Sequence, residues 1–225
     1  MLQLKKTFFC LIFFIFLGFL FTNSELAFCF VSNAQDTKQI LKDTAVIEND
    51  YVIVYKNPSV LNTADNSTAH NRIIVALSKV KIKSSKGILK MHRGDVSLFA
   101  ENENYYSIKG DYFEIKIKDN HPKPASPEKW FEPKKNKIVF DNEDFRIFEE
   151  RLGAKEDREL HSHLQRLVVR LNNTHLTDPR FYPNGQEGKG IQVPNTVKFA
   201  EPVEHVVRNL SDIPVFNIVI EFKGK

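Results

Sequence analysis

The chain has 225 residues but only two cysteines, Cys10 and Cys29, and both lie within the first 34 residues. The remaining sequence has none, so disulfide bonds cannot stabilise it even in an oxidising compartment. Catalysis by a thiolate and metal sites built from cysteine are excluded there for the same reason. A metal bound to this region must be held by His, Asp, Glu or Gln side chains.

Helical periodicity is almost absent after residue 34, where a single short helical turn is predicted within residues 36–43. The sequence also lacks a glycine-rich phosphate loop, a nucleophile elbow and a His-Glu-x-x-His motif. It contains instead many short runs in which apolar and polar residues alternate between turn residues. Alternation with a period of two is typical of half-buried strands. We therefore expect an all-β protein.

The first 34 residues have the order of features found in a secretory signal. Lys5 and Lys6 precede an apolar run from Phe8 to Phe21, and Ser32-Asn33-Ala34 places small residues before a cleavage point. We expect cleavage after Ala34 and export, either to a periplasm or to the medium. The alternative is an uncleaved anchor. Polar residues 22–25 interrupt the run before the roughly 20 residues that a membrane-spanning helix needs, which argues against the anchor. No transmembrane segment is expected in the mature chain.

The charge of the chain is modest and mixed. The formal net charge is +4, and removal of residues 1–34, which include Lys5, Lys6 and Glu25, lowers it to +3. No basic helical stripe is present, so nucleic acid is not an expected partner. The alternating segment Lys79-Val80-Lys81-Ile82-Lys83 is interpreted as a strand with a solvated lysine face.

Segments of the first half recur in the second half. Arg72–Leu77 matches Arg166–Leu171 at an offset of 94, and Tyr112–Lys118 matches Val215–Glu221 at an offset of 103. Ordered matches of this kind indicate a duplicated unit. In the last strand of each copy we expect the alternating apolar residues to face the inside of their own barrel, namely Phe113, Ile115 and Ile117 in the first copy and Phe216, Ile218 and Ile220 in the second.

The predicted architecture is two tandem antiparallel β-barrels or jelly rolls after the signal peptide. Residues 1–34 form the signal peptide, 35–118 the N-terminal barrel, 119–137 a linker and 138–225 the C-terminal barrel. The linker contains four prolines and mixed charge, which favours an extended segment. Its Trp130-Phe131 pair is apolar, and we expect it to dock into a groove between the two barrels.

Histidines in the second half are the candidate metal ligands. His161 and His163 lie two residues apart, so on a strand they point to the same side. A single face is predicted to carry the residues Glu159, His161, His163, Gln165, Leu167, Val169 and Leu171. Its change from polar to apolar suits the inside of a small barrel with a polar mouth and a filled floor. His205 follows later, and Asn209 shares its face if that strand is unbroken.

These residues resemble the two motifs of the cupin superfamily, and the resemblance covers nearly all of the chain after residue 34 as a two-domain bicupin. The C-terminal half is similar to small single-domain cupins of unassigned function. The matching residues are Gly153, His161 and His163 in the first motif and, loosely, Gly190, Pro194, His205 and Asn209 in the second. The resemblance implies a jelly-roll barrel and a metal held by three His and one Glu. The Glu is missing, because Leu167 or Val168 stands in its place.

The residues and the resemblance together predict that His161, His163 and His205 bind a divalent transition metal. Gln165, Glu159 and Asn209 are considered as an additional ligand or as outer contacts. Zn, Mn, Fe, Ni and Cu all suit a three-histidine set. The corresponding function is a metal-dependent activity on a small oxygenated organic molecule. The alternative is a non-catalytic module that binds a small ligand or another molecule and retains a vestigial site.

The first copy serves as a comparison, because Ser67, Ala69 and Asn102 stand at the positions equivalent to the three histidines. It is interpreted as a structural barrel or a lid. Arg166 and Arg208 are considered as partners of a substrate carboxylate. If residues 159–171 form one continuous face, Arg166 points outward, which argues against that role.

Overall fold

The computed structural model describes residues 44–59, 72–99, 105–126, 129–130, 132, 136–181 and 190–223. Within these ranges every regular element is a β-strand, and the strands form four antiparallel sheets. The prediction of an all-β protein is confirmed. The predicted signal peptide and the helical turn at residues 36–43 lie outside the described residues, as do Ser67, Ala69 and Asn102.

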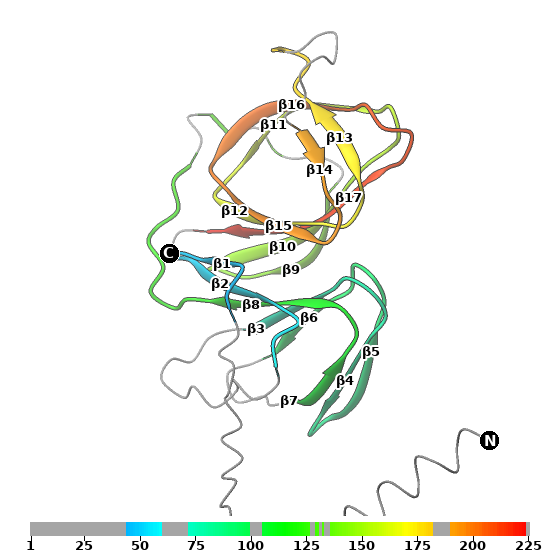
Figure 1. Cartoon of the computed structure of the whole chain (residues 1–225). Helices are drawn as coiled ribbons and strands as arrows, with labels where there is room; N and C mark the ends of the chain where they lie inside the picture. The colour runs from blue at the N-terminus through cyan, green and yellow to red at the C-terminus, as the bar shows by residue number, and fades with distance from the viewer. Residues whose placement is uncertain are drawn as a thin grey trace, which may run out of the picture. The chain divides into compact units, whose positions relative to one another are not determined.

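Two sheets, here called A and B, form the N-terminal half of the described chain (Figure 1). Sheet A has the order β1 (Ile47–Glu48), β2 (Val52–Lys56), β8 (Tyr112–Ile117), β3 (Arg72–Ala76) and β6 (Val96–Phe99), and sheet B the order β5 (Gly87–Met91), β4 (Val80–Ser84) and β7 (Tyr105–Lys109). Ile74 and Tyr112 of sheet A pack in one buried cluster with Ile82 and Met91 of sheet B. Side chains therefore fill the space between these sheets.

The other two sheets, C and D, form the C-terminal half. Sheet C has the order β15 (Thr196–Ala200), β12 (Arg166–Arg170), β17 (Val215–Phe222), β10 (Phe145–Leu152) and β9 (Asn136–Asp141), and sheet D the order β11 (Asp157–His163), β16 (Val203–Asn209), β13 (Thr174–Thr177) and β14 (Gly190–Gln192). In Figure 1 the strands of C and D surround a common interior, as in a barrel.

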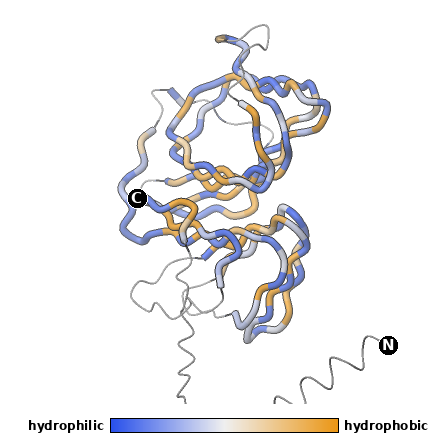
Figure 2. Tube along the Cα trace, in the orientation of Figure 1, coloured by the Kyte–Doolittle hydropathy of each residue, from blue (hydrophilic) through white to orange (hydrophobic). Residues whose placement is uncertain are grey.

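The largest apolar core lies between the two halves rather than within either of them. Side chains of sheet A, such as Val54, Ile73 and Ile115, form one buried cluster with side chains of sheet C, such as Leu167 and Ile218. We call this cluster the interbarrel core. Sheets A and C are the two middle layers of the structure, and apolar residues are concentrated along both (Figures 1 and 2). The two halves are thus held together by packing that resembles a β-sandwich.

The interbarrel core corrects the predicted direction of two strands. Phe113, Ile115 and Ile117 of β8 belong to this core, and so do Ile218 and Ile220 of β17, with Phe216 packed against it. They are buried as predicted, but they face the neighbouring barrel and not the inside of their own. Alternation shows only that one face of a strand is apolar. Here the apolar face is the outer one, because a second sheet covers it.

The two halves share a strand arrangement that agrees with the predicted repeat. In sheet A, β3 lies between β8 and β6, and in sheet C, β12 lies between β17 and β15. The register differs by two residues from the one that the offsets imply. Ile73 lies opposite Ile115, whereas Leu167 lies opposite Ile220 rather than Ile218. A shift of two residues keeps every side chain on its original face. The domain boundaries stay a prediction.

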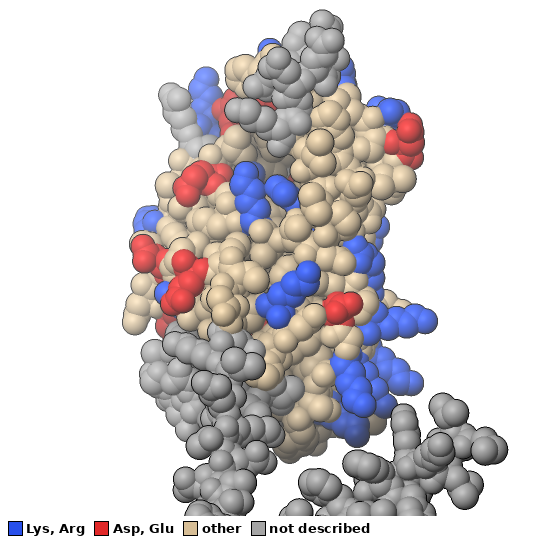
Figure 3. Space-filling view, in the orientation of Figure 1, with Lys and Arg blue, Asp and Glu red and all other residues tan. Residues whose placement is uncertain are grey.

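The lysine-rich strand β4 has the solvated face expected of it. Val80 and Ile82 are buried, whereas Lys81 and Lys83 between them are exposed. In Figure 3, basic side chains gather over this part of the molecule at the lower right. The prediction of a solvated strand face is confirmed.

The predicted docking of Trp130 between the barrels is wrong. Its side chain is 45% exposed, and its indole nitrogen donates a hydrogen bond to Glu132. The segment before it makes the contacts instead. His121 stacks on Tyr51, with ring centroids 5.4 Å apart, and lies edge-on to Phe222. A residue of the N-terminal half and one of the C-terminal half therefore both touch the linker.

Replacement of Ile218 by Ala tests the role of the interbarrel core. Ile218 is fully buried, and removal of its side-chain atoms should lower the free energy of unfolding by about 2–5 kcal/mol. Ile191 is 61% exposed, and its replacement by Ala should change that free energy by less than about 0.5 kcal/mol. Urea denaturation measures both. Equal losses in the two variants would contradict the packing described here.

Candidate metal centre

Three histidines meet on two neighbouring strands of sheet D. On the paired strands β11 and β16, His161 lies directly opposite His205. His163 follows two residues after His161, so it points to the same side of β11. The ring centroids of His161 and His205 are 4.5 Å apart, and those of His161 and His163 are 4.9 Å apart. One ligand atom from each imidazole lies within 4.8 Å of the others. The structure therefore brings together the three histidines that the sequence singles out.

The orientation of two imidazoles is set by hydrogen bonds at Nδ1. The Nδ1 atom of His161 lies 2.8 Å from the backbone carbonyl of Glu159, and that of His163 lies 3.3 Å from the Glu221 carboxylate. The Nε2 atoms of His161 and His205 are buried and have no hydrogen-bond partner among the described residues. His161 therefore has Nδ1 held by an acceptor and Nε2 left open, which is common among histidines that ligate a metal.

Burial keeps two of the imidazoles neutral. It lowers the pKa of His161 to about 4, and the neighbouring His163 and Arg158 act in the same direction. The pKa of His205 falls to about 2, because burial is again the main cause and His161 and His163 add to it. Neutral imidazole is the form that binds a metal. These two side chains are therefore in the ligating form at neutral pH.

Behind His163 stands a buried carboxylate that was not predicted. Glu221 on β17 is fully buried and is paired with Arg146. It also accepts a hydrogen bond of 2.9 Å from the backbone N–H of Leu164. Burial alone would raise the pKa of Glu221, but His163 and Arg146 hold it below its ordinary value. Glu221 is thus an ionised acceptor that orients His163.

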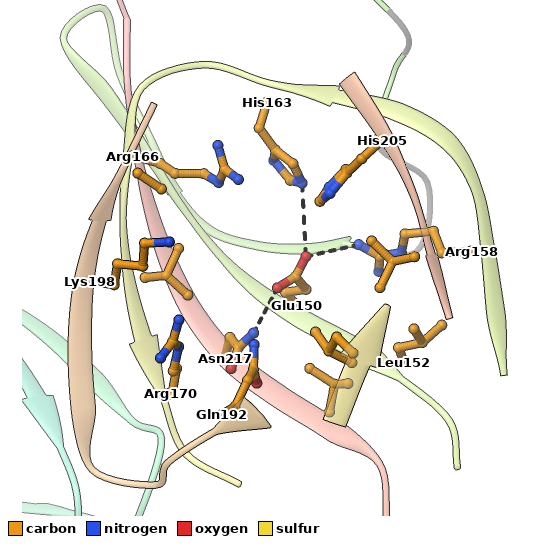
Figure 4. Close-up of a pocket in the computed structure, with 15 residues that line it drawn as sticks. Glu150, Leu152, Arg158, His163, Arg166, Arg170, Gln192, Lys198, His205 and Asn217 are labelled. Carbon is orange, nitrogen blue, oxygen red and sulfur yellow. Dashed lines mark hydrogen bonds and ion pairs between the residues drawn. The ribbon is translucent and has the colours of Figure 1, made fainter. Parts of the chain in front are cut away.

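Glu150 is the second acidic residue missed by the sequence analysis. It lies on β10, with an oxygen 3.9 Å from Nε2 of His163. Its carboxylate accepts hydrogen bonds from Asn217 at 2.8 Å and from Arg158 at 3.2 Å (Figure 4). Burial would raise its pKa, but His163, Arg158 and Asn217 together hold it below the ordinary value. The residue is therefore ionised beside the histidines.

The sequence of β10 itself indicates a polar site at Glu150. The interior positions of β10 are Phe148, Glu150 and Leu152, since Phe145 and Ile147 belong to the interbarrel core. An acid between two apolar interior residues marks a polar site on a buried face. The family resemblance places the carboxylate a few residues after His163, whereas Glu150 precedes His163 by thirteen residues in the sequence.

The additional ligands considered from the sequence lie elsewhere. Gln165 accepts a hydrogen bond of 2.6 Å from the Tyr51 hydroxyl and donates one to Glu201. Asn209 is fully buried, and its amide donates to the carbonyls of Gly153 and Ile213. Glu159 is exposed, and its backbone carbonyl contacts Nδ1 of His161. Of the three, Glu159 alone makes an outer contact with a histidine.

A turn at residues 164–165 explains why the continuous face was predicted wrongly. Strand β11 ends at His163 in sheet D, and β12 begins at Arg166 in sheet C. Beyond this turn the parity changes. Arg166 and Arg170 line the interior, whereas Leu167 and Val169 pack into the interbarrel core. The prediction that Arg166 points outward is wrong.

His163 and His205 open onto a cavity of about 130 Å³ inside the C-terminal barrel. Its wall includes His163, His205 and Glu150, together with basic and amide side chains from sheets C and D (Figure 4). Arg208, the other predicted partner of a carboxylate, is not part of this wall, since it is paired with Asp157 at 2.6 Å. The geometry can hold a metal ion at one end of a cavity large enough for a small molecule.

The metal-free protein should lose stability as the pH falls from about 6.5 towards about 4. In the unfolded chain His161 and His205 titrate near their ordinary pKa of about 6.5, so in this window the unfolded state binds more protons. The free energy of unfolding therefore decreases with decreasing pH. Urea denaturation in a chelator, from about pH 7.5 to about pH 4.5, measures the slope. A variant with His161→Gln and His205→Gln should show a shallower slope, and an unchanged slope would contradict the assignment.

Comparison with known proteins gives similarities of fold. No protein-family model and no curated protein matches the chain. A cupin domain from Bordetella pertussis Tohama I is 24% identical, with a TM-score of 0.34, and covers 44% of this chain and 100% of its own. A cupin 2 conserved barrel domain protein from Leptotrichia buccalis is 14% identical, with a TM-score of 0.48 and coverages of 81% and 88%. Vicilin from Corylus avellana is 10% identical, with a TM-score of 0.41 and coverages of 81% and 84%.

These identities and TM-scores are low, so the architecture is established by the strands of the chain itself. The described residues form two sets of antiparallel sheets, and a three-histidine group that could hold a metal lies in the second set. This all-β arrangement is consistent with a member of the cupin superfamily, as the sequence analysis expected.

Proposed function

We propose that the C-terminal barrel binds one divalent transition metal through His161, His163 and His205. The observation that carries this proposal is the group of three imidazoles with ligand atoms within 4.8 Å of one another. The Nε2 atoms of His161 and His205 are buried and have no hydrogen-bond partner in the described part of the chain. A buried polar atom without a partner is costly, and a metal ion would satisfy both Nε2 atoms. The nitrogen donors suit Zn, Mn, Fe, Ni and Cu alike.

Glu150 supplies the carboxylate that the sequence motif lacks. Its distance of 3.9 Å from Nε2 of His163 suits two donors that share one ion, each at a bond length of about 2.0–2.2 Å. Arg158 and Asn217 hold the carboxylate in place, as outer contacts commonly do for a metal ligand. We propose that Glu150 completes a set of three histidines and one carboxylate.

The function that this site supports best is a metal-dependent reaction of a small oxygenated organic molecule. A bound metal would supply Lewis acidity to an oxygen atom of the ligand. The protein contributes a cavity beside His163 and His205 and the Glu221–His163 contact, which fixes the imidazole.

Ligand binding without catalysis is the second candidate. It is favoured by polar atoms of the cavity wall that have no partner among the described residues, such as Nε of Arg170 and Oδ1 of Asn217. Both candidates use the same cavity. They differ in whether replacement of the three histidines abolishes the function or leaves ligand binding intact.

Metal content is the direct test of the first candidate. Protein purified without chelators and measured by elemental analysis should contain about one divalent transition metal per chain, because the site offers one set of ligands. The triple variant His161→Ala, His163→Ala, His205→Ala should contain none. Saturation at about a hundred times the dissociation constant should stabilise the wild type by about 2.7 kcal/mol.

Two matched variants serve as controls. His92 is exposed and lies near Asp95 in the N-terminal half, so His92→Ala should keep the full metal content. Glu150→Gln should weaken metal binding by about 10–100-fold, whereas Glu149→Gln on the other face of β10 should not. Metal retained by the triple variant, or a wild type that neither contains metal nor gains stability from it, would rule out the site.

We further propose that the protein is exported. The support is the order of a basic start, an apolar run and small residues before position 35. Within the part of the chain that the structure describes, no helix is long and apolar enough to cross a membrane. Mass spectrometry of the protein recovered from a secreting host should find an N-terminus at Gln35. Recovery of the intact chain from the cell interior would refute export.

A further inference from the structure

The cavity beside the three histidines carries an excess of positive charge. Arg158, Arg166, Arg170 and Lys198 all line it, and Glu150 is the single acid in the lining. Arg158 is neutralised, since it lies 3.2 Å from Glu150. Even when Arg146 and Glu221 behind the wall are included, five cations stand against two carboxylates. Among the residues that the structure describes, three cations of the cavity therefore lack an ion-pair partner.

Arg166, Arg170 and Lys198 lie together on the wall that β12 and β15 form. Figure 4 shows their charged ends on one side of the cavity, opposite Arg158. The pairing of β12 with β15 places Val168 opposite Lys198, so the lysine lies beside both arginines. Because like charges repel at short range, such a group is stable only when an anion or solvent compensates it.

The two arginines differ in how they are held. Arg166 donates hydrogen bonds to the backbone carbonyls of Leu164 and Glu201, at 3.2 and 2.8 Å, so its guanidinium is fixed before any ligand arrives. Arg170 has a buried Nε atom with no partner among the described residues. Burial lowers the pKa of both side chains. Arg166 is thus held in place on the wall, and Arg170 keeps a donor that an anionic ligand could use.

The N-terminal half shows that the fold does not require these charges. At the offset of 94, Arg72 corresponds to Arg166 and Ala76 to Arg170. Ser97 takes the place of Lys198, because it lies opposite Ile74 as Lys198 lies opposite Val168. The one shared cation is compensated internally. Arg72 lies over the ring of Tyr105, whose hydroxyl donates a hydrogen bond of 2.6 Å to the buried Glu114.

We propose that the cavity of the C-terminal barrel binds a small organic acid by its carboxylate. Arg170 and Lys198, with Arg166 beside them, hold the carboxylate, and the rest of the molecule extends towards the histidines. This deepens the proposed function by naming the class of its ligand. It rests on that function only for the direction in which the ligand points, since the contact with the carboxylate needs no metal.

The size of the cavity limits the ligand. A cavity of about 130 Å³ is close to one known to accept benzene, so it takes a ligand of about six non-hydrogen atoms. A phosphate group is bulkier than a carboxylate and leaves less of this space for an organic part that reaches the histidines. A planar carboxylate also matches the fork of an arginine. These points favour a short carboxylic acid over a phosphate ester.

Isothermal titration calorimetry tests the proposal with matched pairs of probes. Lactate and malonate carry a carboxylate, and lactamide and malonamide are neutral molecules of nearly the same shape. Each is titrated into the chelator-treated protein and into the zinc-loaded protein. The carboxylates should bind both forms, and the amides should bind at least about tenfold more weakly, because they lack the charge-assisted hydrogen bonds. Inorganic phosphate is the competing anion.

Two variants of the wall locate the contact. Arg170→Met and Lys198→Met remove a charge and keep most of the side-chain volume, and each should weaken lactate or malonate binding by at least about tenfold. Lys198 is exposed, so its replacement does not disturb the core. Arg208→Met and Lys81→Met remove exposed charges outside the cavity and should change binding by less than about twofold. Metal content should be unchanged in all four variants.

The outcomes separate this inference from the proposed function. Lack of carboxylate binding, equal binding of the amides, or losses in Arg170→Met and Lys198→Met no larger than in the controls would overturn it. Phosphate binding tighter than that of either carboxylate would overturn the ligand class. Carboxylate binding by a protein that takes up no metal would support the inference while the proposed metal site fails. Metal binding without carboxylate binding would support the proposed metal site and overturn the inference.

Discussion

The packing of sheet A against sheet C is the constraint on which the rest of the structure depends. Both sheets are covered on their two faces, and the apolar residues of one face join in the interbarrel core. A strand has only two faces, so this packing sends every second residue of β10, β12 and β17 towards the partner sheet. The remaining residues face the barrel interior. The barrel interior can therefore contain polar and charged residues, because the main apolar core lies outside it.

The interior of the C-terminal barrel contains charged and polar side chains. Glu150, Asn217 and Glu221 alternate with apolar residues on the inner faces of β10 and β17. Buried charges are stable only when they are paired and hydrogen-bonded. Glu221 has Arg146 and His163, and Glu150 has Arg158 and Asn217. Among the described residues, the buried polar atoms without a hydrogen-bond partner include Nε2 of His161 and His205, Nε of Arg170 and Oδ1 of Asn217.

The two halves show how one fold can serve different purposes. In the N-terminal half the interior is filled by residues such as Met91, Phe99 and Tyr112, and its buried Glu114 is paired inside the protein with Tyr105. The C-terminal half keeps a cavity instead, and its basic wall residues have no counterparts in the first half beyond Arg72. Function thus depends on the side chains of the interior and not on the barrel.

The sequence by itself determined the all-β class and the direction shared by His161 and His163, and it indicated His205 as a third candidate ligand. These follow from local geometry, since side chains two residues apart on one strand always point the same way. Tertiary structure decided what the sequence left open. It decided which face of β8 and β17 lines the barrel and which packs into the interbarrel core, because a neighbouring sheet can cover either face. It changed the parity at the turn between His163 and Arg166, which brought Arg166 and Arg170 into the cavity. It also supplied Glu150 from β10, a strand of the opposite sheet, because only the closure of the barrel brings that carboxylate to the histidines.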